Sequence, residues 1–106
     1  MPKYLFHGSY TATGAAGVLK DGGSGRATAV TALAKSVGGT IESMYWAFGK
    51  DDFFVVADMP DAESAAALSL TVGASGSVNV TTSELLTAAQ VDAAAKRRVE
   101  YRPPGA

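Results

Sequence analysis

The order of apolar and polar residues predicts β-strands in four segments of the chain. In the segment 3–10, Tyr4 and Phe6 fall on one face of an extended chain, and Leu5 and His7 fall on the other. This period of two predicts a β-strand. The segment 40–48 is rich in β-branched and aromatic residues and is predicted to be a second strand. A hairpin turn at 49–52 joins it to a third strand at 53–58, and alternation predicts a fourth strand at 77–86.

Between these predicted strands, apolar residues recur at helical spacing. The segment 13–20 has weak helical character, and the glycine-rich 22-GGSG-25 interrupts it before a second helical segment. After the third predicted strand, Asp61 is a suitable N-cap for a helix over 62–74. The pattern therefore predicts one interrupted helix after the first strand and one regular helix after the third.

The last predicted helix has the clearest start signal in the chain. Thr87 and Gln90 form a Thr-x-x-Gln capping box. The basic residues within 96–101 suit the negative end of a helix dipole, so the helix is expected to end there. The tail, from about 100 to 106, contains two adjacent prolines and is expected to be extended.

The order of the predicted elements defines the fold class. A βαββαβ order with a final helix is typical of an α+β, ferredoxin-like fold, in which an antiparallel four-stranded sheet carries two helices on one face. We expect residues 1–106 to form a single domain of this kind. No segment is left to cover the other sheet face. Domains of this plan often pair their sheets between subunits, so a homo-oligomer built on a dimer is expected.

The composition of the chain argues against some classes of binding partner. Nine basic and ten acidic residues give a net charge of −1, which offers no field for nucleic acid. Charged residues make up 18% of the chain, below the typical quarter. That shortage fits a surface covered by another subunit, although abundant alanine gives the same value. There is no long apolar run and no leader sequence, so we expect a cytoplasmic protein that does not enter membranes.

Three segments carry a resemblance to a known family: 4-YLFHGSYT-11 followed by Gly14, 38-GGTIESMYWAFGKDDFFVVADMPD-61 and 76-GSVNVTTSELL-86. The chain resembles the GYD-domain family of small bacterial proteins, which is grouped with the dimeric α/β-barrel proteins. At the family's Gly-x-Tyr-Asp motif, Gly49 and Asp52 match and Asp51 replaces the tyrosine. The resemblance implies a ferredoxin-like subunit that oligomerises through its sheet. It implies no reaction, although relatives in the wider superfamily include monooxygenases and haem-handling enzymes.

The hairpin turn holds the first candidate site. Asp51 and Asp52 are adjacent carboxylates, which could act as an acid/base pair or bind a hard cation. Neighbours in a turn usually point apart, and aspartate is favoured there because it bonds its own backbone. We therefore favour a structural role, in which Asp52 accepts backbone N–H bonds across the turn.

The second candidate is a ligand pocket around the only histidine of the chain. His7 is the one possible histidine base, but a lone histidine supplies one ligand where a transition-metal site needs three or four. No metal site is therefore predicted. On the second predicted strand, alternation places Glu42, Met44, Trp46 and Phe48 on one face. Apolar walls with a few polar anchors make a usual ligand pocket, for which the candidates are His7, Glu42, Met44, Trp46 and Asn79. The same residues could instead form a core or a subunit interface.

Three classes of function remain open. The sparse ionisable residues and the absence of cysteine favour a non-catalytic protein, without a cofactor, that binds a small molecule or serves a structural role. A small enzyme, cofactor-free or haem-dependent, would use a sheet-face pocket around His7. A regulatory adaptor would dock on another protein through the sheet face or the tail. The sequence alone does not decide whether the protein is an enzyme.

Overall fold

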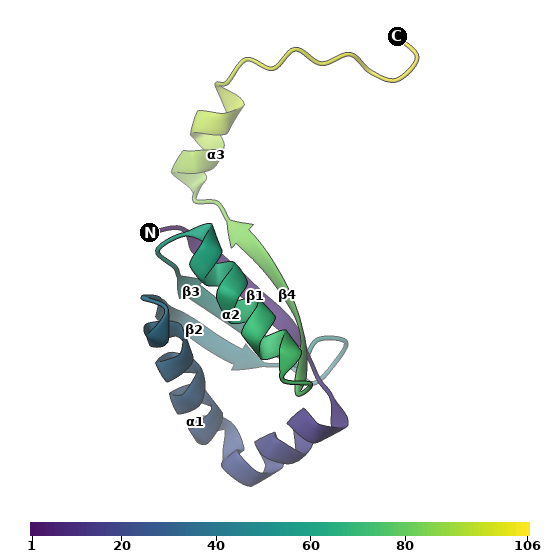
Figure 1. Ribbon diagram of the computed structural model, residues 1–106. Coiled ribbons are helices and arrows are strands. Elements are labelled where there is room, and N and C mark those ends of the chain that lie inside the picture. Colours follow the sequence, from purple (N-terminus) through teal and green to yellow (C-terminus); the bar gives the residue numbers. More distant parts are fainter.

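The computed structural model describes all 106 residues and contains four strands and three helices (Figure 1). In chain order they are β1 (Lys3–Tyr10), α1 (Ala12–Ser36), β2 (Thr40–Trp46), β3 (Phe53–Asp58), α2 (Ala62–Ala74), β4 (Val78–Leu85) and α3 (Ala88–Ala95). This is the predicted order. The bounds of β1, β3 and α2 are also those predicted from the sequence.

The four strands form one antiparallel sheet in the order β2-β3-β1-β4. Helices α1 and α2 lie on the same face of this sheet, whereas α3 continues beyond the end of β4 and leaves the sheet behind (Figure 1). This arrangement confirms the predicted α+β, ferredoxin-like fold. It also leaves the second face of the sheet without a helix over it.

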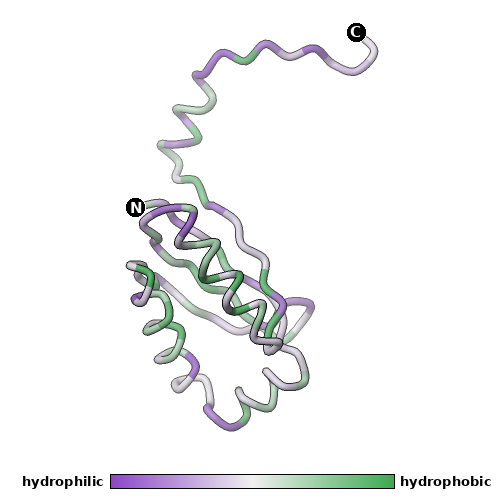
Figure 2. Tube along the Cα trace, in the orientation of Figure 1, coloured by the Kyte–Doolittle hydropathy of each residue, from purple (hydrophilic) through white to green (hydrophobic).

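The core lies between the sheet and the two helices that cover it. Alternate residues of the strands point into it, together with Ala65 and Leu68 of α2 and with Met59, which is fully buried. The hydropathy of the chain follows this division, with hydrophobic residues along α2 and the strands behind it (Figure 2). The buried hydrophobic residues of the strands are Tyr4, Phe6, Phe53, Val55, Ala57 and Val78.

At two glycines in the first half of the chain, the backbone lies very close to β4 or to the residue before it. A Cβ at Gly14, in the first turn of α1, would lie 2.0 Å from the carbonyl oxygen of Ser77. A Cβ at Gly8 of β1 would lie 1.8 Å from the carbonyl oxygen of Asn79. Both contacts are with backbone, which cannot move aside as a flexible side chain can. These two positions therefore require glycine.

A β-bulge in β2 corrects one expectation from the sequence. The pairing of β2 with β3 shifts between Ile41 and Ser43, so one extra residue of β2 interrupts the alternation. After the bulge, Met44 lies opposite Val55 and faces the core. A one-residue shift moves every later side chain to the other face of the sheet. The prediction that Glu42 shares a face with Met44 and Trp46 was therefore wrong.

The turn after β2 ends this strand two residues earlier than predicted. Phe48 has a φ of 53°, in the left-handed region that a strand cannot contain, and its side chain is exposed. The amide of Ala47 still donates to the carbonyl of Asp52 across the turn. The strand therefore stops at Trp46, and the residues that follow form a closed loop.

Helix α1 is interrupted where the sequence predicted a break. Gly22 has a φ of 71° and a ψ of 172°, which divides α1 into two helical pieces. Thr11 caps the first piece, since its side chain accepts a hydrogen bond from the amide of Gly14. The break lets the second piece turn back along the sheet toward β2 (Figure 1).

The other two helices begin with the predicted caps. The carboxylate of Asp61 accepts from the amide of Ser64 at 2.8 Å. Thr87 and Gln90 form the reciprocal capping box, with side-chain to backbone distances of 3.2 and 2.8 Å. None of the three helices is both long enough and apolar enough to span a lipid bilayer.

Candidate functional site

The helix-free face of the sheet, called here the open face, carries the side chains that alternate with the core residues. Leu5 and His7 of β1 lie opposite Val56 and Phe54 of β3, and His7 also lies opposite Thr81 of β4. The side chains of the two central strands on this face are half-buried even though no helix covers them. The open face is thus a mixed surface with an apolar centre and hydroxyl groups along β4.

His7 and Asp51 form an ion pair or a strong hydrogen bond on the open face. The Nδ1 atom of His7 lies 2.8 Å from Oδ2 of Asp51, and the two side chains are 24% and 31% exposed. The ring of His7 also stacks on that of Phe54, with ring centres 6.0 Å apart and planes 7° apart. The imidazole is therefore held from one edge and from one flat side.

The position of the His7 ring has a chemical consequence. An ionised carboxylate only accepts hydrogen bonds, so Nδ1 carries the hydrogen in this contact. The other ring nitrogen, Nε2, has no hydrogen-bond partner within the chain. In the neutral imidazole, Nε2 is then an acceptor available to a bound molecule. A histidine oriented by a carboxylate is suited to hold a hydrogen-bond donor or to accept a proton.

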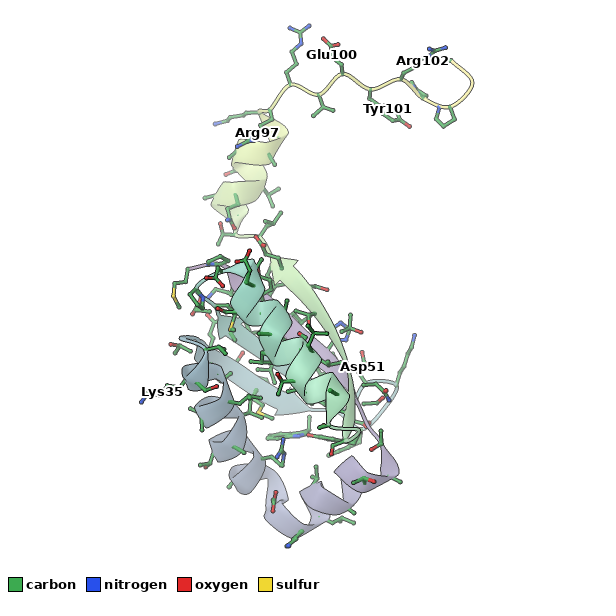
Figure 3. The ribbon with its side chains drawn as sticks, viewed as in Figure 1. Lys35, Asp51, Arg97, Glu100, Tyr101 and Arg102 are labelled. Carbon is green, nitrogen blue, oxygen red and sulfur yellow. The ribbon has the colours of Figure 1, made fainter.

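Asp52 holds the turn that delivers Asp51. Its Oδ2 accepts from the amide of Tyr10 at 2.9 Å, and its own amide donates to the carbonyl of Gly8 at 2.6 Å. Asp52 thus ties the β2–β3 turn to the end of β1, and its carboxylate accepts from an amide of β1 rather than from one across the turn. Because the turn is held there, Asp51 lies within hydrogen-bonding distance of His7. Figure 3 shows Asp51 in this turn.

The structure separates the five residues that the sequence grouped in one pocket. Met44 and Trp46 lie under the helices, where Trp46 Nε1 donates to the hydroxyl of Tyr10 at 2.9 Å. His7 and Asn79 belong to the opposite face, since Asn79 pairs with Ser9 and alternates with core residues of β4. The proposed grouping is therefore wrong, and the bulge in β2 is the reason.

Glu42 belongs to a cluster at the other end of the sheet. Nζ of Lys3 lies 2.8 Å from Asp58 and 3.2 Å from Glu42. Hydrogen bonds to Asp58 and then to Glu42 raise the pKa of Lys3 above its usual value of 10.5. Lys3 thus bridges the two carboxylates, and Glu42 lies with Lys3 and Asp58 rather than with His7.

The pairing of His7 with Asp51 is the feature that the sequence reasoning missed. The two residues are 44 positions apart, and each was considered without the other. The predicted topology could have revealed this pair. The strand β3 follows directly on the turn and pairs antiparallel with β1, so the turn lies beside the end of β1. No group of three His, Cys, Asp or Glu side chains lies close enough together to hold a metal ion.

A second feature is a small cavity under the helices. It has a volume of about 60 Å³ and is lined by twelve hydrophobic residues and Arg26. Met44 is one of the lining residues, along with Phe6 and Leu68. The cavity is thus a packing gap between α1, α2 and the sheet, and its walls offer almost no polar group to orient a ligand.

A comparison with known protein families shows to which family the chain belongs. The family model described as GYD domain matches residues 4–95. The chain belongs to the GYD-domain family. No curated protein and no solved structure gives a significant match to it. For this GYD domain, the matched range covers the sheet except for its first residue, Lys3, together with all three helices and the turn that bears Asp51.

Proposed function

We propose that this GYD-domain protein is a homo-oligomer that binds a small molecule on its open sheet face without transforming it. The observation that carries the proposal is the His7–Asp51 pair at 2.8 Å on a sheet face that no helix covers. A half-buried apolar centre beside it, with Leu5, Phe54 and Val56, is unfavourable in water. Pairing of two such faces removes this surface from water and encloses the pair.

The groups around His7 define the chemistry of the ligand. Nε2 accepts a hydrogen bond, the ring of Phe54 offers an apolar surface, and Thr81 offers a hydroxyl on the neighbouring strand. A small molecule with a flat apolar body and one hydroxyl or N–H donor fits these groups. Asp51 adds a negative charge behind the imidazole, which disfavours an anionic ligand.

The single histidine provides a direct test. In a fragment screen followed by NMR, the imidazole signals of His7 report on this site alone. We expect flat fragments with a hydroxyl or N–H donor to shift these signals in the wild type and to bind His7→Ala at least about tenfold more weakly. The control Lys35→Ala, on the exposed end of α1, should bind as the wild type does (Figure 3). Fragments that bind equally well to His7→Ala would disprove the site.

Catalysis is the second candidate, and one specific observation favours it. The 2.8 Å contact orients His7 so that Nε2 can take a proton, as a general base does. The test is to incubate each bound fragment with the wild type and with His7→Gln and to follow it by mass spectrometry. Conversion by the wild type alone would replace the binding function with an enzymatic one. Unchanged fragments in both samples support binding without catalysis.

A further inference from the structure

The C-terminal arm, defined as residues 86–106, makes no buried contact with its own chain. Helix α3 has no buried residue, and the arm extends away from the sheet (Figure 1). Four of the nine large hydrophobic side chains that the chain exposes belong to this arm: Leu86, Val91, Val99 and Tyr101. The capping box shows that α3 is specified as a helix, yet the rest of the chain gives it nothing to pack against.

The arm and the rest of the chain carry opposite charge. The arm has four basic residues and two acidic ones, whereas residues 1–85 have five basic and eight acidic ones. No residue of the arm takes part in an ion pair. Figure 3 shows Arg97 and Arg102 on the arm, away from the sheet and from Asp51. Arg102 donates to the carbonyl oxygen of Ala106 within the arm, and the side chains of Lys96, Arg97 and Arg98 have no partner in the chain.

A groove along α2 and the edge strand β4 has the shape to receive a helix. It is open to solvent, and the residues on its helical side are mostly small, so a second backbone can approach α2 closely. Leu70, which is 74% exposed, stands in this groove without a partner. The residues of α2 that line it are Ala62, Ala65, Ala66, Ser69, Leu70, Gly73 and Ala74.

One end of the groove is acidic. Glu84 accepts a hydrogen bond from the hydroxyl of Tyr4 at 3.2 Å, and Asp61 and Glu63 lie at the start of α2 beside it. Burial, together with the hydrogen bond and the nearby charges of these three carboxylates, raises the pKa of Tyr4 above 10.0. None of the three carboxylates is paired with a basic side chain.

We propose that the arm of one copy of the chain docks in this groove of a second copy, with α3 antiparallel to α2. The spacing of the groups agrees with this orientation, at a rise of about 1.5 Å per residue within the helices and with Arg97 two positions beyond the end of α3. Six positions separate Val91 from Arg97, and seven separate Leu70 from Glu63. Val91 therefore covers Leu70 when Arg97 reaches Glu63. The basic end of α3 then meets the acidic end of the groove.

The same charges argue against docking of the arm on its own chain. β4 ends beside the start of α2, because Glu84 and Glu63 both act on Tyr4. An arm folded back from this end would run parallel to α2. Its basic residues would then lie about 12 Å or more along α2 from the acidic cluster, since α3 has eight residues. Only an arm from another copy brings the two charged ends together.

The chain has no cysteine, so engineered pairs can test this contact. A chain with Leu70→Cys is mixed with a chain with Val91→Cys under mild oxidation. We expect a disulfide-linked heterodimer, identified by mass spectrometry. The control mixes Val91→Cys with Leu19→Cys, which is 89% exposed on α1 and outside the groove, and should give at least about tenfold less cross-linked product.

Charge variants test the orientation. Arg97→Glu with Arg98→Glu, added to the Val91→Cys chain, should lower the yield by about tenfold, and Glu63→Lys with Glu84→Lys on the Leu70→Cys chain should restore it. Equal yield with Leu19→Cys, or no yield with Leu70→Cys, would overturn the proposal. So would a monomer with an internal disulfide as the main product of the chain that carries both cysteines.

Discussion

At the scale of single residues, two adjacent aspartates serve two different purposes. Asp52 accepts a hydrogen bond from the amide of Tyr10 and ties the turn to β1, whereas Asp51 contacts His7. The structural role of Asp52 followed from the ordinary chemistry of turns, in which aspartate accepts backbone N–H bonds. The role of Asp51 did not, because its partner depends on how β1 and β3 align, and local sequence patterns do not fix that register.

Truncation of the two aspartates should therefore have unequal effects on stability. Asp52→Ala removes the acceptor of a backbone amide at a strand end, and we expect it to lower the free energy of unfolding by about 1–3 kcal/mol. Asp51→Ala removes a partly exposed pair and should cost about 1 kcal/mol or less. Urea denaturation at pH 7 measures both, with Asp21→Ala on the exposed surface of α1 as the control. A larger loss for Asp51→Ala would contradict this division of roles.

At the scale of elements, local signals predicted most of the fold. Asp61 and the Thr87–Gln90 pair fixed two helix starts because capping is a contact between residues three positions apart. The bulge after Ile41 was missed for the opposite reason. It is a property of the pairing between two strands, and the alternation of β2 alone gives no sign of it. This one missed residue was enough to place Met44 and Trp46 on the wrong face.

The start of α1 offers a test of packing between elements. Gly14→Ala places a Cβ against the carbonyl of Ser77, and we expect it to lower the free energy of unfolding by about 2–3 kcal/mol. Gly17→Ala, one turn further along the same helix, meets no atom within 4 Å. It should stabilise the protein by about 0.5–1 kcal/mol, because alanine is the better helix former. Thermal denaturation of the two variants separates them, and similar changes in both would show that α1 does not pack against Ser77 as described.

The cap of α2 gives a dependence on pH. Hydrogen bonds donated by Ser64 hold the pKa of Asp61 below its usual value of 3.8. A lowered native pKa means that the ionised cap stabilises the folded state above pH 3.8 and that this contribution is lost as the pH falls through the native pKa. Asp61→Asn keeps a capping oxygen without a charge. We expect its Tm to be lower than that of the wild type at pH 7 and the gap to narrow by pH 2. A gap that is constant over this range would rule out the ionised cap.

At the scale of the whole molecule, two surfaces remain without partners within the chain. The open face and the C-terminal arm lie on different elements, so each can contact another copy without competing with the other. The low share of charged residues, 18%, agrees with a protein that covers part of its surface by association. The sequence could indicate this shortage and the uncovered sheet face. It could not indicate that α3 would leave the body of the molecule, because capping specifies a helix and not its packing.

A charge at the centre of the open face separates association through the sheet from association through the arm. Val56 lies on this face opposite Leu5, and Val56→Glu would bury an unpaired carboxylate wherever two sheets meet. If the proposed sheet-paired dimer forms, its dissociation constant should rise by at least about tenfold in this variant, as measured by light scattering over a dilution series. Circular dichroism checks that the variant remains folded. Leu19→Glu, at a side chain that is 89% exposed on α1, is the matched control and should leave the dimer unchanged. If Val56→Glu keeps the wild-type mass at every dilution, the open face is not the dimer interface, and the half-buried residues around His7 must be covered in another way.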